Sequence, residues 1–162
     1  MKILLVDDSG TMRQIQKMIL QGMGLKDIIE AADGTQAVRM AIEQQPALIL
    51  MDWNMPGMKG IDALRKLKAA DVTKAIPVIM VTSESEKSHV LEAVRAGAAN
   101  YMVKPITPEV VKEKLGPYMI HYGVASVVKP ASSPSSAEKP PAGEGAKPAD
   151  APAAETKPAA PK

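Results

Sequence analysis

The fold is decided by the stretch Leu48-Ile49-Leu50-Met51-Asp52-Trp53-Asn54-Met55-Pro56-Gly57 near the middle of the chain. It opens with an apolar run typical of a strand buried on both faces and closes with a Pro-Gly turn. Asp52 lies where the strand gives way to the turn, so we expect its carboxylate to be exposed rather than buried. A second apolar run, residues 3–6, also ends in acid, at Asp7 and Asp8. The two runs predict that three carboxylates share one site.

Strands and helices alternate on both sides of this stretch. The predicted strands cover residues 3–6, 27–31, 47–51, 77–81 and 99–103. A helix follows each strand, and we expect its apolar residues, three or four apart, to face inward. In chain order these sets are Met12, Ile15, Met18, Ile19 and Met23; Ala37, Val38, Ala41 and Ile42; Ile61, Leu64 and Leu67; Val90, Leu91 and Val94; and Val110, Val111 and Leu115.

The ends of two helices carry clear signals. Ser9 is placed to cap the first helix, and Thr107 followed by Pro108 is placed to begin the fifth. The pair Gly116-Pro117 predicts that the fifth helix kinks or ends near Leu115, because proline cannot donate a backbone hydrogen bond.

Five strand-helix units with short connections predict an α/β, flavodoxin-like (βα)5 fold. Its parallel five-stranded sheet would have the order 2-1-3-4-5 and carry helices on both faces. Ligands of such sheets bind at the carboxyl ends of the strands, near the switch between the first and third. Thr82 follows the fourth strand and Lys104 the fifth, so we expect both at the edge where the three carboxylates lie.

The chain divides into a folded domain, residues 1–122, and a tail, residues 123–162. The tail holds 8 of the 14 prolines and contains no Leu, Ile, Met or aromatic residue. It is predicted to be disordered because it cannot bury enough apolar surface to offset the entropy of ordering. Its recurring Lys-Pro-Ala triplets leave a tether and a solubilising tail both open.

Charge and composition exclude several classes of protein. The net charge of +2, from 20 basic and 18 acidic residues, is too small to create an electrostatic field that would attract nucleic acid. Cysteine is absent, which excludes thiol chemistry and disulfides. The N-terminus does not read as a signal peptide, and no apolar run reaches the roughly 20 residues of a membrane span. We therefore expect a cytoplasmic monomer without membrane insertion.

The predicted edge is an oxygen-only, anionic site. Carboxylates of Asp7, Asp8 and Asp52 suit Mg²⁺ better than zinc or copper. Structural roles for Asp7 and Asp8, as caps or turn acids, are the alternative. A carboxylate can also attack phosphorus to give an acyl phosphate, and the Thr82 hydroxyl and Lys104 ammonium can then stabilise the phosphoryl oxygens.

Four motifs in this order resemble the receiver domain of two-component response regulators: Asp7-Asp8, Met51–Gly57, Val81-Thr82-Ser83 and Lys104-Pro105. Within that family, Met51–Gly60 and Asn100–Pro105 look most like the CheY-type chemotaxis regulators. The resemblance implies that Asp52 accepts a phosphoryl group from a histidine kinase of the CheA type. It also implies that Asp7, Asp8, Asp52 and the Asn54 backbone carbonyl hold Mg²⁺, and that the Lys104-Pro105 peptide is cis.

The resemblance further implies a switch. When Thr82 moves toward the phosphoryl group, Tyr101 turns inward, and the face formed by the fourth helix, fifth strand and fifth helix binds an effector such as the flagellar motor switch protein. Asn54 and Glu84 flank the path of the attacking water and tune dephosphorylation, alone or with a phosphatase partner. A mere packing role for Tyr101 is the alternative.

The sequence says less about the roles of Trp53 and the two histidines. Trp53 adjoins the acceptor, so it is either a reporter of the site or a surface residue without a role. His89 and His121 fall on the fourth and fifth helices, and we expect both to face solvent.

Two other phosphate-handling classes fit less well. A haloacid-dehalogenase-type phosphatase needs a second acid two residues after its nucleophile, and a flavodoxin needs a Ser/Thr/Gly phosphate loop where this chain has acids. A phosphorelay carrier or a phosphate sink, within the same fold, stays open. A direct transcription factor is not expected, because the tail cannot fold into a DNA-binding domain.

Overall fold

Five parallel strands form one sheet in the order β2-β1-β3-β4-β5, as predicted. The computed structural model describes residues 1–83 and 87–122, so the predicted tail lies outside the described residues. The strands are β1 (Ile3–Val6), β2 (Ile28–Ala31), β3 (Leu48–Asp52), β4 (Val78–Thr82) and β5 (Asn100–Val103). The helices are α1 (Gly10–Gly22), α2 (Gly34–Gln44), α3 (Gly60–Ala69), α4 (Lys87–Arg95) and α5 (Pro108–His121).

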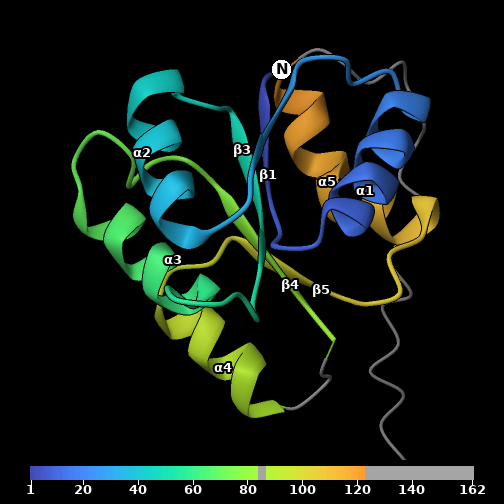
Figure 1. Ribbon diagram of the computed structural model, residues 1–162. Helices are drawn as coiled ribbons and strands as arrows, with labels where there is room; N and C mark the ends of the chain where they lie inside the picture. The colour runs from blue at the N-terminus through green and yellow to red at the C-terminus, as the bar shows by residue number, and fades with distance from the viewer. Residues whose placement is uncertain (84–86, 123–162) are drawn as a thin grey trace, which may run out of the picture. The chain divides into compact units, whose positions relative to one another are not determined.

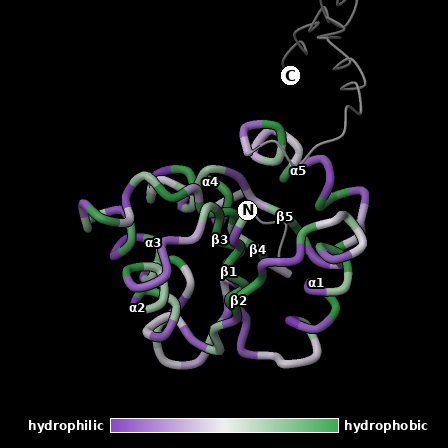
Figure 2. The backbone as a smooth tube through the Cα atoms, turned by 90° about the horizontal axis from the view of Figure 1, so that it is seen from above, coloured by the Kyte–Doolittle hydropathy of each residue, from purple (hydrophilic) through white to green (hydrophobic). Residues whose placement is uncertain are grey.

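Helices cover both faces of the sheet. In Figures 1 and 2, α1 and α5 lie together on one face, and α2, α3 and α4 lie on the other. Contacts of α1 with α5 and of α2 with α3 agree with this division. The flavodoxin-like architecture predicted from the sequence is therefore confirmed.

Strand side chains alternate between two apolar clusters, one on each face. Along β1, Leu4 and Val6 join the cluster under α2, α3 and α4, whereas Ile3 and Leu5 join the cluster under α1 and α5. The chain has no Phe, and methionines fill part of the space: Met51, Met55, Met80, Met102 and Met119 are all buried.

The strand register brings the carboxyl ends of β1, β3, β4 and β5 to the same edge of the sheet. Val6 pairs with Met51, Asp52 pairs with Val81, and Thr82 pairs with Val103. Residues that end these strands or follow them directly therefore meet at one edge of the sheet.

The inward face of α1 differs from the prediction. Its buried residues are Gln16 and Leu20, one helical turn apart, and Ile19 and Met23 pack beside them. Met18, which was predicted to face inward, is 62% exposed, and Ile15 is also exposed. The prediction was wrong because hydrophobic spacing could not place a glutamine in the core.

Two further helices turn small residues inward. Ala93 is buried on α4, whereas Leu91 and Val94, both predicted to face the core, are exposed. On α2, Ala37 and Ala41 are buried as predicted and Ile42 is exposed. Alanines face the sheet here because close approach of a helix leaves no room for a larger side chain.

The fifth helix does not end near Leu115. α5 continues to His121 with Pro117 inside it, so the prediction that the helix ends near Leu115 is wrong, whereas the alternative of a kink there stays a prediction. Leu115 and Met119, four residues apart, are both buried against the sheet, and this packing outweighs the backbone hydrogen bond that Pro117 cannot donate. The predicted caps are confirmed: Ser9 accepts from the Met12 N–H and Thr107 from the Val110 N–H.

Within residues 1–83 and 87–122, no helix combines the length and the apolar character that crossing a membrane requires.

Candidate functional site

Three carboxylates meet at the carboxyl edge of the sheet, as the sequence predicted. Asp7 and Asp8 follow β1, and Asp52 is the last residue of β3. One oxygen from each lies within 4.8 Å of the others. Asp7 and Asp52 are buried and Asp8 is exposed, so the cluster opens to solvent on the Asp8 side.

The prediction that Asp52 is exposed is wrong, because its side chain is only 3% exposed. β3 runs one residue further than predicted, and Asp52 pairs within the sheet with Val81. Burial raises the pKa of the Asp52 carboxyl, and the nearby Asp7 and Asp8 charges add to this, while the hydrogen bond and charge of Lys104 oppose it. The acceptor predicted from the sequence is thus a desolvated carboxylate.

Lys104 bridges two of the three acids. Its Nζ lies 2.8 Å from Asp52 Oδ1 and 3.4 Å from Asp7 Oδ2. Burial alone would lower the pKa of Lys104, but hydrogen bonds and attraction to Asp52 and Asp7 outweigh burial and raise it. The peptide between Lys104 and Pro105 is cis, as expected. A protonated ammonium therefore sits against the carboxylate pair.

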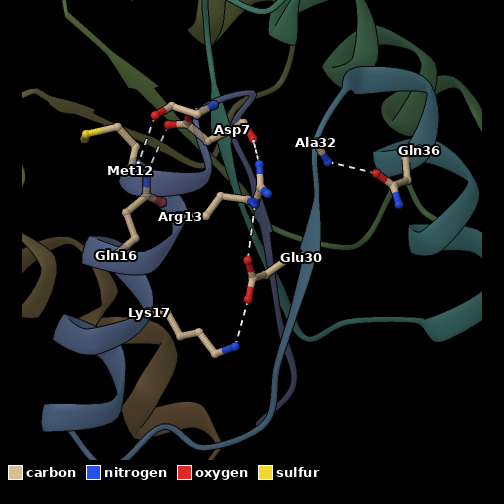
Figure 3. Close-up of polar contacts among 9 residues, drawn as sticks. Asp7, Met12, Arg13, Gln16, Lys17, Glu30, Ala32 and Gln36 are labelled. Carbon is tan, nitrogen blue, oxygen red and sulfur yellow. Dashed lines mark hydrogen bonds and ion pairs between the residues drawn. The ribbon is translucent and has the colours of Figure 1, made fainter.

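Asp7 is held by α1, in a network that sequence reasoning missed. Its Oδ1 accepts from the Ser9 N–H at 2.9 Å, and its Oδ2 accepts from Gln16 Nε2 at 3.3 Å. Its backbone carbonyl accepts from Arg13 Nη1 at 2.6 Å, and Arg13 also pairs with Glu30 on β2 (Figure 3). No spacing in the sequence could have shown these contacts, because they join side chains of one helix to the ends of two strands.

Thr82 ends the strand next to β3, and Asn54 lies in the turn that follows β3. Thr82 ends β4 and is buried, and its carbonyl accepts from the Lys104 N–H at 2.7 Å. Asn54 is exposed in the turn after β3. Glu84, predicted to tune dephosphorylation, lies outside the described residues.

Gly60 fixes the backbone beneath the acceptor. It opens α3, and its N–H donates to the Trp53 carbonyl at 3.1 Å. A Cβ added at Gly60 would lie 2.0 Å from the Asp52 carbonyl oxygen. Only glycine fits this close approach, which brings the start of α3 against the end of β3.

Trp53 is a buried residue rather than a surface one. It is 5% exposed, and its ring stacks on that of His89 with centroids 4.6 Å apart and an angle of 27° between the ring planes. The expectation that His89 faces solvent is therefore wrong, since the ring contacts the loop after the acceptor. His121 is exposed, as expected.

Tyr101 lies in the middle of β5 and pairs with Met80 on β4. It is partly buried and packs against the cluster under α2, α3 and α4. Lys114 of α5 places its Nζ 5.6 Å from the centre of the Tyr101 ring. Tyr101 therefore contacts both the core and the helix next to it.

The donor set fits Mg²⁺. All three candidate ligand atoms are carboxylate oxygens, and the exposure of Asp8 leaves a side on which water can complete the coordination. Hard oxygen ligands of this kind do not favour zinc or copper.

Residues 3–116 match the response regulator receiver domain family. The chain belongs to this family. Chemotaxis protein CheY1 of Helicobacter pylori strain J99 is 46% identical over 116 residues, which cover 71% of this chain and 94% of CheY1. Chemotaxis protein CheY of Pseudomonas aeruginosa PAO1 is 47% identical over 115 residues, which cover 71% of this chain and 93% of that relative.

Solved receiver structures share the fold. Chemotaxis regulator CheY4 of Vibrio cholerae superimposes with a TM-score of 0.67 at 32% identity, over 72% of this chain and 97% of CheY4. The receiver domain of sensor histidine kinase PA1611 of Pseudomonas aeruginosa PAO1, solved with a magnesium ion coordinated in its active site cleft, gives 0.67 at 29% identity, over 73% and 96%. The present receiver domain is CheY-like, a signalling protein rather than a conventional enzyme.

Proposed function

We propose that this receiver domain acts in chemotaxis signalling by accepting a phosphoryl group on Asp52 from a CheA-type histidine kinase, with Mg²⁺ as cofactor. The observation that carries the proposal is the position of the buried Asp52 carboxylate. It lies in a carboxylate cluster with Asp7 and Asp8, and 2.8 Å from Lys104. An acceptor, a set of hard oxygen ligands and a fixed cation at one place are what phosphoryl transfer requires.

The metal ligands in this proposal are Asp7, Asp8, Asp52 and the backbone carbonyl of Asn54. When bound, Mg²⁺ offsets the negative charge of the phosphoryl oxygens. Without the metal ion the three carboxylates repel one another, and burial together with this repulsion raises the pKa of Asp52 against the opposing effect of Lys104.

The transfer itself exchanges one bond to phosphorus for another. A carboxylate oxygen of Asp52 forms a bond to phosphorus while the phosphorus–nitrogen bond of the kinase phosphohistidine breaks. The electron pair stays on the imidazole nitrogen, and the product on this chain is an aspartyl phosphate. Burial of Asp52 favours the reaction because the nucleophile carries little of the hydration that would otherwise have to be removed.

Lys104 and Thr82 receive the phosphoryl oxygens. Lys104 holds a carboxylate oxygen of Asp52 in the unphosphorylated chain, and it pairs with a phosphoryl oxygen once that charge has arrived. Thr82 is on the neighbouring strand and offers its hydroxyl to a second oxygen.

The output in this proposal is the face formed by α4, β5 and α5. Movement of Thr82 toward the phosphoryl group lets Tyr101 turn inward and changes this face, which then binds the flagellar motor switch protein. The uninterrupted course of α5 to His121 supports this assignment, because the face keeps its full helix despite Pro117. The chain acts as a monomer, and Asn54 and Glu84 set the rate at which water removes the phosphoryl group.

Binding of the beryllofluoride-loaded full chain to a purified flagellar motor switch protein tests the proposal. We expect the loaded chain to bind and the unloaded chain to bind at least tenfold more weakly, a difference of about 1.4 kcal/mol. Tyr101→Ala should lose the difference and Tyr101→Phe, which keeps the ring, should retain it. Equal binding with and without beryllofluoride would contradict an effector role. Transfer of the phosphoryl group to a second histidine protein would identify a phosphorelay carrier instead.

A further inference from the structure

Gln16 is a buried polar residue on the inward face of α1. Its side chain is 2% exposed, and Leu20 lies buried one turn further along the helix. Its Nε2 donates to Asp7 Oδ2 at 3.3 Å, and Figure 3 shows the side chain reaching from α1 toward the Asp7 carboxylate. Gln16 therefore links the core under α1 and α5 to the acidic cluster.

The oxygen atom of the Gln16 amide, Oε1, is buried without a stabilising polar contact of its own among the described residues. Among residues 1–83 and 87–122, no donor forms a hydrogen bond with Gln16 Oε1. A buried carbonyl oxygen without a donor lowers the stability of the folded state. An apolar side chain of similar size would avoid this loss and pack against the same core, but it could not donate to Asp7 Oδ2, so the contact with Asp7 is what the glutamine supplies here.

The Asp7 carboxylate is fixed by donors on both oxygens. The Ser9 N–H holds Oδ1, while Gln16 and Lys104 both donate to Oδ2. Lys104 is shared with Asp52, at 2.8 Å, and in the proposed function it turns to the phosphoryl group. Gln16 is then the side chain that keeps holding Asp7 Oδ2.

We propose that Gln16 is a positioning residue for the magnesium site, which holds the Asp7 carboxylate in the orientation that coordinates the ion. This inference rests on the proposed function, because it assumes that Mg²⁺ binds Asp7. Donors that orient a ligand commonly change metal affinity by tenfold or more when they are removed. Gln16 acts through Asp7 and does not itself contact the ion.

The role predicts that metal affinity and metal-free stability respond differently to substitution. Gln16→Leu removes the donor to Asp7, so the Mg²⁺ dissociation constant should rise roughly tenfold. The same change also removes the unsatisfied Oε1 from the core, which offsets the lost hydrogen bond to Asp7, so the Tm of the metal-free protein should change little. A purely structural residue would lower the metal-free Tm.

Thermal unfolding of the full chain over a series of MgCl₂ concentrations measures both quantities, since a ligand that binds only the folded state raises Tm by an amount set by its concentration relative to its dissociation constant. Isothermal titration calorimetry gives the dissociation constant independently. Gln16→Met, an unbranched substitute, serves as a second variant where Leu disturbs packing. Gln14→Leu, on the exposed side of the same helix, is the matched control and should leave the Mg²⁺ affinity unchanged.

An unchanged Mg²⁺ dissociation constant in both Gln16 variants would overturn the inference. A fall in the metal-free Tm of both variants would also overturn it, in favour of a structural role. Failure of the wild-type chain to bind Mg²⁺ would instead contradict the proposed function on which the inference depends.

Discussion

Lys104 Nζ lies 2.8 Å from Asp52 Oδ1, and this ion pair joins the residue after β5 to the last residue of β3. Asp52 is almost fully buried whereas Lys104 is partly exposed, so the carboxylate depends on Lys104 more than Lys104 depends on the carboxylate.

Loss of Lys104 should therefore leave a buried carboxylate without its nearest cation. We expect Lys104→Met to lower the free energy of unfolding of the metal-free protein by about 2 to 3 kcal/mol. In an Asp52→Asn background the same change should cost less, because only the longer contact of Lys104 with Asp7, at 3.4 Å, is then lost. Denaturant unfolding of the four proteins measures the coupling, and an equal cost in both backgrounds would show that the ion pair contributes nothing.

Glu30 should make stability depend on pH. Hydrogen bonds from Lys17 and Arg13, with their charges, outweigh burial and lower the pKa of Glu30 below its usual 4.5. An acid with a lowered pKa stabilises the folded state above its unfolded pKa, and that stability is lost as the pH falls through the lowered value. Glu30→Gln should thus cost about 0.5 to 1 kcal/mol at pH 7 and nothing in strong acid.

Denaturant unfolding at both pH values checks this prediction for Glu30. The control is Glu43→Gln, which removes the carboxylate of the exposed pair with Arg39. A cost for Glu30→Gln that is the same in acid as at neutral pH would mean that charge is not its cause.

Gly60 should not tolerate alanine. The added Cβ would lie 2.0 Å from the Asp52 carbonyl oxygen, a distance that forces the start of α3 away from β3. We expect Gly60→Ala to cost about 3 kcal/mol and to slow phosphorylation of Asp52. Gly22→Ala, at the end of α1, is the control, because a Cβ there meets nothing within 4 Å and should stabilise α1 by about 0.5 to 1 kcal/mol. Similar unfolding free energies for the two variants would contradict the close approach.

Asn54 should govern the lifetime of the phosphorylated chain. It is exposed in the turn after the acceptor, where an arginine side chain can cover the path of the attacking water. We expect Asn54→Arg to slow dephosphorylation severalfold in a phosphate-release assay. Gln21→Arg adds the same charge at the far end of α1 and should leave the rate unchanged. Equal dephosphorylation rates for Asn54→Arg and Gln21→Arg would show that Asn54 does not set the lifetime of the phosphorylated chain.

The sheet and its reactive edge could be predicted because both follow from chain order. Parallel strands bring their carboxyl ends together, so an acid that ends one strand must lie near an acid that ends its neighbour. Asp7, Asp8 and Asp52 needed no further information to be placed together. Their distances agree with that expectation.

Helix orientation and burial could not be predicted in the same way. On α1, Ile15 and Met18 are as apolar as the residues that turn inward, and only the position of Asp7 gives Gln16 a reason to be buried. The burial of Asp52 was missed for a similar reason, since β3 continues to Asp52 and pairs it with Val81 of β4, which is distant in the sequence. Contacts between residues far apart in the chain leave no periodic signal.

In the proposed function, Asp52 is the residue that carries the phosphoryl group. The intact mass of the purified full chain after incubation with Mg²⁺ and acetyl phosphate tests this role. We predict that the wild-type chain gains the mass of one phosphoryl group, that omission of Mg²⁺ prevents the gain, and that Asp52→Asn abolishes it. A chain that gains no mass, or an Asp52→Asn variant that gains as much as the wild type, would contradict the account.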